Sequence, residues 1–174
     1  MISREDLESD KRFHISKTEL DWLFSKLKIY KYECVDIEIG RLRRFDGKKI
    51  ISLKETINYK YLENPNDKRI SNLYEQYCKE QENLLDNPDR SRTIFDKLRD
   101  DILDTEYNPQ NGIIIINQYN IIEDGLHRSC ILLKKHGPDF VVKVLKIKRR
   151  NSKKLLYLSP LYELKQAISN SRNG

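Results

Sequence analysis

The stretch Asn120–Cys130 constrains the fold of this chain most strongly, because it joins an apolar strand to an apolar helix through a polar turn. The six residues 124–129 include an acid, a glycine, a histidine, an arginine and a serine. A strand-to-helix turn directs backbone N–H groups and the positive end of the helix dipole at one place. The pattern therefore predicts an anion-binding site. The alternative is a capped helix whose polar first turn only faces water.

The side chains of this turn suit phosphate chemistry. Gly125 lets the backbone approach a ligand closely or adopt a positive φ. Arg128 can hold phosphate oxygens with two N–H groups, and His127 can donate a hydrogen bond or move a proton. Asp124 places a carboxylate beside the predicted anion, which indicates a metal ion or acid–base catalysis.

The composition limits the class of protein. A chain of 174 residues can form one domain with a sizeable core. Its net charge of +6 favours an anionic partner: a nucleotide, a nucleic acid, a sugar phosphate or a membrane surface. The apolar runs are too short for a transmembrane helix and the first residues lack a secretory core, so we expect a cytoplasmic protein with at most peripheral membrane contact. Scattered cysteines and histidines argue against disulfides and a protein-built metal cage.

Hydrophobic periodicity predicts interleaved helices and strands, and hence an α/β or α+β fold. The expected helices cover about 16–28, 68–85, 91–103, 125–136 and 159–169. A capping-box pattern at Ser16 predicts the start of the first, and Ser91 can cap the third. The expected strands cover about 32–40, 113–116, 120–122 and 140–147, and Asp46-Gly47 predicts a hairpin turn. In this interpretation a helical lead-in over 1–32, with a polar and loose start over 1–15, precedes a domain over 33–150. That domain carries a helical insertion at about 68–104, and a C-terminal helix follows over 151–174.

The order of these elements resembles a known family. Strand, hairpin, strand, D-G-x-H-R turn, helix, Gly-Pro break and closing V-K-V strand are similar to the ParB/sulfiredoxin-like superfamily, in particular its D-G-x-H-R members from bacterial polysaccharide-biosynthesis loci. The similarity covers roughly 33–148 and is sharpest over Gly112–Ile147. A second match is 52–62, which looks like the S-L-E-E-T/S-x-H-Y-x-x-L signature of those members. Asn58 stands there where histidine is usual, and Lys54 where an acid is common.

The resemblance implies nucleotide binding in a single ParB/sulfiredoxin-like domain with a small mixed sheet. In this superfamily the turn wraps the phosphates of ATP, ADP or CTP. By position, the phosphate-binding residues are then Gly125, His127, Arg128 and Ser129. Asp124 assists proton transfer or holds Mg²⁺. The superfamily includes a free serine kinase whose glutamate acts as base on the substrate hydroxyl, and Glu55 best matches that glutamate. The implied catalytic set is thus Glu55, Asp124 and His127.

Departures from the family narrow the expected activity. Leu126 stands where sulfiredoxins carry the nucleophilic cysteine, and Cys130 lies on the apolar side of the predicted helix as a small core residue. The chain has no room after the sheet for the helix-turn-helix domain of partition proteins. These departures argue against sulfiredoxin chemistry and against sequence-specific DNA binding.

The resulting hypothesis is a nucleotide-dependent phosphotransferase, a kinase that acts on a hydroxyl of a small molecule such as a sugar or surface-polysaccharide precursor. The alternative is a non-catalytic nucleotide-sensing or DNA-associated module of ParB type, or an NTPase or nuclease. Two basic groups leave alternatives open. Arg41 and Arg43 either reach the ligand or lie on the surface. The basic stripe over 143–154 either docks nucleic acid, anionic lipid or glycan, or protects a solvated strand edge.

Overall fold

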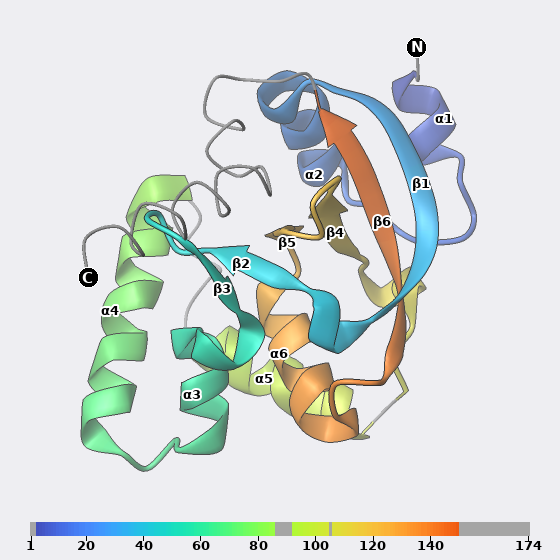
Figure 1. Cartoon of the computed structure of the whole chain (residues 1–174). Coiled ribbons are helices and arrows are strands. Elements are labelled where there is room, and N and C mark those ends of the chain that lie inside the picture. Colours follow the sequence, from blue (N-terminus) through green and yellow to red (C-terminus); the bar gives the residue numbers. More distant parts are fainter. Residues whose placement is uncertain (1–2, 86–91, 105, 150–174) are drawn as a thin grey trace, which may run out of the picture.

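The computed structural model describes residues 3–85, 92–104 and 106–149 (Figure 1). Its centre is a four-stranded sheet with the strand order β1-β6-β4-β5. These strands are β1 (Ile29–Glu38), β4 (Ile114–Asn117), β5 (Ile122–Asp124) and β6 (Val141–Arg149). The β4–β6 pair is parallel and the other two pairs are antiparallel. The predicted α/β (α+β) class is confirmed. The predicted helix at 159–169 and a cap at Ser91 lie outside the described residues.

Helices cover both faces of this sheet (Figure 1). On one face the core includes residues of α3 (Ile57–Glu63), α4 (Lys68–Leu85), α5 (Arg92–Asp104) and α6 (Leu126–His136). The other face packs against α1 (Arg4–Glu8), α2 (Lys17–Trp22) and the π-helical turn η1 (Leu23–Leu27). The side chains of β4 and of the residue before it alternate between the two cores. Ile114 and Ile116 belong to the first core, whereas Ile113 and Ile115 belong to the second. A strand covered on both faces needs such a continuous apolar run.

Residues 3–15 include a helix and pack against the sheet, which corrects the loose start expected for 1–15. Helix α1 begins with a capping box at Ser3, and Leu7 and Phe13 are buried against the sheet. The apolar residues are too sparse here for sequence periodicity to reveal the contact. The predicted capping box at Ser16 does start α2. Strand β1 runs across residue 33, where the sequence placed a domain boundary.

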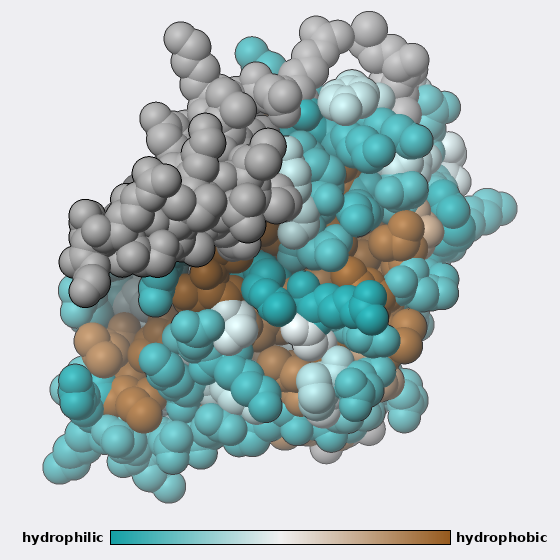
Figure 2. Space-filling model, viewed as in Figure 1, coloured by the Kyte–Doolittle hydropathy of each residue, from teal (hydrophilic) through white to brown (hydrophobic). Residues whose placement is uncertain are grey.

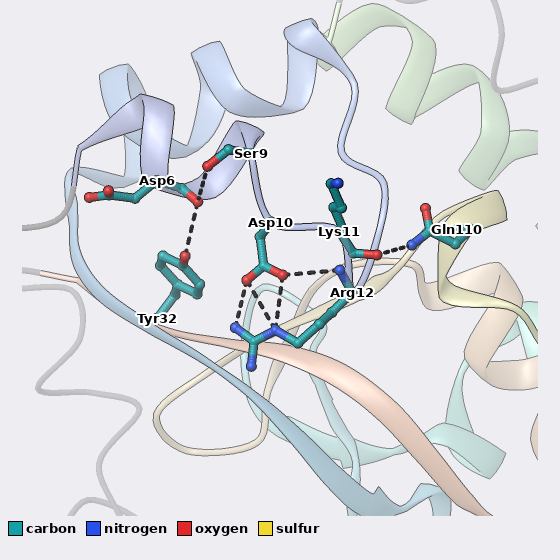
Figure 3. Close-up of polar contacts among 7 residues, drawn as sticks. All are labelled: Asp6, Ser9, Asp10, Lys11, Arg12, Tyr32 and Gln110. Atoms are coloured by element: carbon teal, nitrogen blue, oxygen red, sulfur yellow. Dashed lines mark hydrogen bonds and ion pairs between the residues drawn. The ribbon is translucent and has the colours of Figure 1, made fainter.

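Polar contacts fasten this segment to the rest of the fold (Figure 3). The Tyr32 hydroxyl of β1 donates to the Asp6 carbonyl over 3.2 Å. The Gln110 side chain donates to the Lys11 carbonyl, and the His14 N–H donates to the Pro109 carbonyl. Both of these loop residues belong to the short 3-10 helix η5 (Pro109–Asn111). The N-terminal segment therefore braces the loop that precedes β4.

A second, two-stranded sheet forms the predicted hairpin, β2 (Arg43–Phe45) and β3 (Ile50–Ser52). The 3-10 turn η2 (Ile39–Arg41) leads into it from β1, and the 3-10 turn η3 (Leu53–Glu55) follows it. The Arg43 N–H donates to the Asn120 carbonyl over 3.0 Å, which attaches the hairpin beside β5. The hairpin thus brings η3 toward the layer that contains α6.

Candidate phosphate-binding turn

Gly125 directly follows strand β5 and is the N-cap residue of helix α6. Its φ is 85° and its ψ is 23°, in the left-handed region that favours glycine. A Cβ built on Gly125 would lie 3.1 Å from the Ile114 Cα and 3.2 Å from its Cγ1. The residue at 125 must therefore be small for two reasons, its backbone conformation and the close approach of β4.

The first turn of α6 has the properties of an anion site. No side chain of the described residues caps its N-terminus, and no acidic residue lies in its first turn. The first amides of a helix have no acceptor within the helix, and they carry the positive end of its dipole. With 11 residues, α6 is long enough for this dipole to matter. An anion placed beside Gly125 would meet these amides.

Arg128 lies against the loop before β4. Its Nη2 donates to the Asn111 carbonyl over 3.4 Å, and its guanidinium contacts Gly112 at the place where a Cβ would be. Gly112 has a φ of 121°, so its conformation also favours glycine. The side chain of Arg128 remains half-buried. The braced loop after η5 thus sets the direction in which this arginine leaves the helix.

His127 points to the helical layer. Its Nε2 is 3.0 Å from the Tyr74 hydroxyl of α4, and its ring centroid is 4.4 Å from that of Phe95 in α5. Tyr74 also stacks on Tyr61 at 4.4 Å. The ring of His127 is therefore held at the edge of an aromatic cluster, with Nε2 oriented by a tyrosine. Such contacts fix the orientation of the His127 ring.

The other two residues of the turn differ in exposure. Ser129 is fully buried, and both its N–H and its hydroxyl donate to the Gly125 carbonyl over 2.9 Å. Asp124 is half-buried and pairs with Ile115 in the β4–β5 ladder. Its place directly before Gly125 puts one carboxylate at the entrance of the turn.

Glu55 already has a structural role. Its Oε2 accepts hydrogen bonds from the Ser52 N–H over 2.8 Å and from the Ser52 hydroxyl over 2.7 Å. These bonds, the backbone one first, hold the pKa of the Glu55 carboxyl below its usual value. Glu55 is exposed and ionised at neutral pH, so it can accept a proton, although a low pKa weakens it as a base.

The two segments that resemble the family, 52–62 and 112–147, contact each other. The Thr56 hydroxyl, next to Glu55, is 3.5 Å from the Cys130 Sγ of α6. Cys130 is fully buried, as predicted, and burial raises the pKa of its thiol to about 12. The segment with Glu55 therefore packs directly on the helix that follows the 124–129 turn.

A small cavity of about 320 Å³ lies beside Glu55. It is lined by Glu55, Ile57, Lys60, Asp67, Arg69, Ile70 and Leu73. Hydrophobic residues also gather over α4 on the face seen in Figure 2. Its lining of three apolar side chains, two cations and two carboxylates suits a small polar molecule.

The other basic candidates are engaged elsewhere. Arg41 pairs with Glu38 on the surface, and the Arg43 guanidinium donates to the carbonyls of Gly40 and Leu42. The stripe over 143–154 is described only as far as 149. Strand β6 is an inner strand between β1 and β4, so the idea of a lysine-protected edge is wrong for its described part. The sequence could not show this, because strand order depends on distant pairing.

A magnesium ion needs few protein ligands. Within the described ranges, no group of three or more His, Cys, Asp and Glu side chains could hold a metal ion. However, Mg²⁺ is commonly bound through one or two carboxylates together with substrate phosphates. Asp124, the carboxylate next to the turn, fits that type of site.

Comparison with protein-family models, with curated proteins and with solved structures finds no match to this chain. The family resemblance thus remains a prediction from the residues quoted above. None of the described helices is both long and apolar enough to span a membrane.

Proposed function

We propose that this protein is a nucleotide-dependent phosphotransferase of the ParB/sulfiredoxin-like type, which transfers a phosphoryl group from ATP or ADP to a hydroxyl of a small molecule. The observation that carries the proposal is the uncapped first turn of α6, which follows Gly125 and has His127 and Arg128 on it. The first amides of α6, the positive end of its dipole and the guanidinium of Arg128 together suit a polyphosphate. A sugar or surface-polysaccharide precursor is the acceptor that the resemblance implies.

Each group has a defined part in this reaction. Amides of the 124–129 turn and Arg128 bind the phosphates, and Asp124 would hold the Mg²⁺ that neutralises their charge. Glu55 accepts the proton of the acceptor hydroxyl, and the hydroxyl oxygen attacks the terminal phosphorus. The nucleotide leaves with one phosphate fewer. The cavity beside Glu55 is where the acceptor would bind.

Thermal unfolding with ATP, ADP, CTP or GTP and Mg²⁺ tests nucleotide binding, because a ligand that binds the folded state raises the melting temperature according to its affinity. We expect a nucleotide to stabilise the wild type, and Arg128→Ala to lower its affinity by about 1–3 kcal/mol through loss of a charge-assisted contact. Arg41→Ala is the matched control, since Arg41 pairs with Glu38 at the surface. No shift with any nucleotide would remove the proposal.

The hydrogen bonds of Glu55 favour a second candidate, a nucleotide-sensing module without catalysis. Its Oε2 caps η3 through Ser52, and this is reason enough for an acid at 55. Glu55→Gln distinguishes the two functions, because glutamine retains a capping oxygen and loses the base. A kinase variant should bind nucleotide normally and lose turnover. For a sensor, the wild type should already lack turnover, and the variant should bind nucleotide as the wild type does.

A further inference from the structure

Arg44 is a basic residue that the sequence did not single out. It lies in β2, is half-buried, and its Nη1 donates to the Ile122 carbonyl of β5 over 3.2 Å. Ile122 is two residues before Asp124. The N–H of the neighbouring Arg43 donates to the Asn120 carbonyl just before β5, so the hairpin holds the Arg44 side chain against this strand. Arg44 therefore reaches the strand that enters the 124–129 turn.

The hairpin that carries Arg44 also leads to the segment with Glu55, because Arg44 pairs with Ile51 of β3 and η3 follows that strand. The positive charge of Arg44 acts on the Cys130 thiol of α6, where it opposes the effect of burial on the pKa. The Cys130 Sγ is 3.5 Å from the hydroxyl of Thr56, the residue after Glu55. Arg44 thus contacts β5 directly, and its hairpin continues through β3 into the segment that packs on α6.

Arg44 has no acidic partner among the residues that the structure describes. Arg41 pairs with Glu38 and Arg149 with Glu123, whereas the Arg44 guanidinium donates to a backbone carbonyl, the one acceptor it has within the described ranges. A guanidinium has five N–H donors. A partly buried cation without a counter-ion is unfavourable, and an anionic ligand would relieve this cost. Its remaining donors form a fork that matches two phosphate oxygens.

We propose that Arg44 binds the terminal phosphate of the nucleotide, the one that faces Glu55. This inference rests on the proposed function and extends it to the substrate class. The site then selects a nucleoside di- or triphosphate over a monophosphate, because Arg44 meets only the last phosphate. Arg128 and the α6 amides hold the phosphates nearer the nucleoside.

Calorimetric titration of the full chain with AMP, ADP and ATP, each with Mg²⁺, tests this role. Arg44→Gln should weaken binding of the phosphoryl donor, whether this is ATP or ADP, by about tenfold or more, since a charge-assisted contact to its terminal phosphate is lost. For the nucleotide one phosphate shorter than the donor, the affinity of the variant should lie within about twofold of the wild-type affinity, because no contact to that nucleotide changes. Arg41→Gln makes the same charge change at the surface and should leave all three affinities unchanged.

Arg44→Lys keeps the charge and should restore part of the lost affinity, which separates a ligand contact from a folding defect. A melting temperature without ligand is measured for each variant. If the wild type binds no nucleotide, the proposed function and this inference fall together. If the wild type binds nucleotide and Arg44→Gln loses affinity equally for all three, or for none, the role of Arg44 is wrong and the proposed function stands.

Discussion

Replacing Gly125 by alanine tests the geometry on which the candidate site depends. Two costs add at this position. Alanine in the left-handed region is disfavoured by about 1–2 kcal/mol. Its Cβ would also lie 3.1 Å from the Ile114 Cα, which is backbone and cannot rotate away, and such overpacking costs about 1–3 kcal/mol. Alanine restricts the unfolded chain and returns about 0.4–1 kcal/mol. We therefore expect Gly125→Ala to lower the free energy of unfolding by about 1–5 kcal/mol.

Gly47→Ala is the matched control. Gly47 has a similar φ of 95°, but no atom of the described part of the chain lies within 4 Å of a Cβ built there. Only the conformational cost remains, so we expect a loss of about 1 kcal/mol or less. Urea unfolding of both variants and of the wild type gives the two differences, provided that the slope with denaturant is unchanged. Equal losses for the two variants would refute the close packing of β4 against the 124–129 turn.

Three further predictions concern the surroundings of the site. Cys130 should stay unlabelled by iodoacetamide at pH 8 in the folded protein and react in urea, because burial raises the pKa of its thiol to about 12; labelling of the folded chain at Cys130, found by mass spectrometry, would contradict its burial. The lowered pKa of Glu55 contributes stability that is present above its unfolded value of about 4.5 and is lost as pH falls through the lower folded value. Denaturation from pH 3 to 7 should accordingly show a weaker pH dependence for Glu55→Gln, and identical curves would rule this out. Asn117→Ala should cost about 2–4 kcal/mol in chemical unfolding, since its buried amide accepts from the N–H groups of Tyr119 and Ile121 and donates to Glu123; a loss under 1 kcal/mol would show that this amide does not hold the β4–β5 turn.

The sequence predicted the elements near the site closely. The expected helices at 68–85 and 125–136 correspond to α4 (Lys68–Leu85) and α6 (Leu126–His136). The hairpin at Asp46-Gly47 and the capping box at Ser16 are present as well. These features depend on local signals: a glycine at a turn, an oxygen at a cap, and apolar residues at helical spacing. Local rules therefore determined where most elements lie and where α6 begins.

Only the tertiary structure decided which residues meet. The pairing of β6 with β1 on one side and β4 on the other made an inner strand of a segment that looked like an edge. The hairpin placed Arg44 beside β5, and α4 and α5 placed Tyr74 and Phe95 around His127. Arg44 and Ile122, for example, are 78 positions apart in the sequence, and contacts of this kind depend on which faces bury together. Periodicity reports the faces of one element, whereas the choice of partner depends on packing of the whole chain, so the surroundings of the site lay beyond the sequence alone.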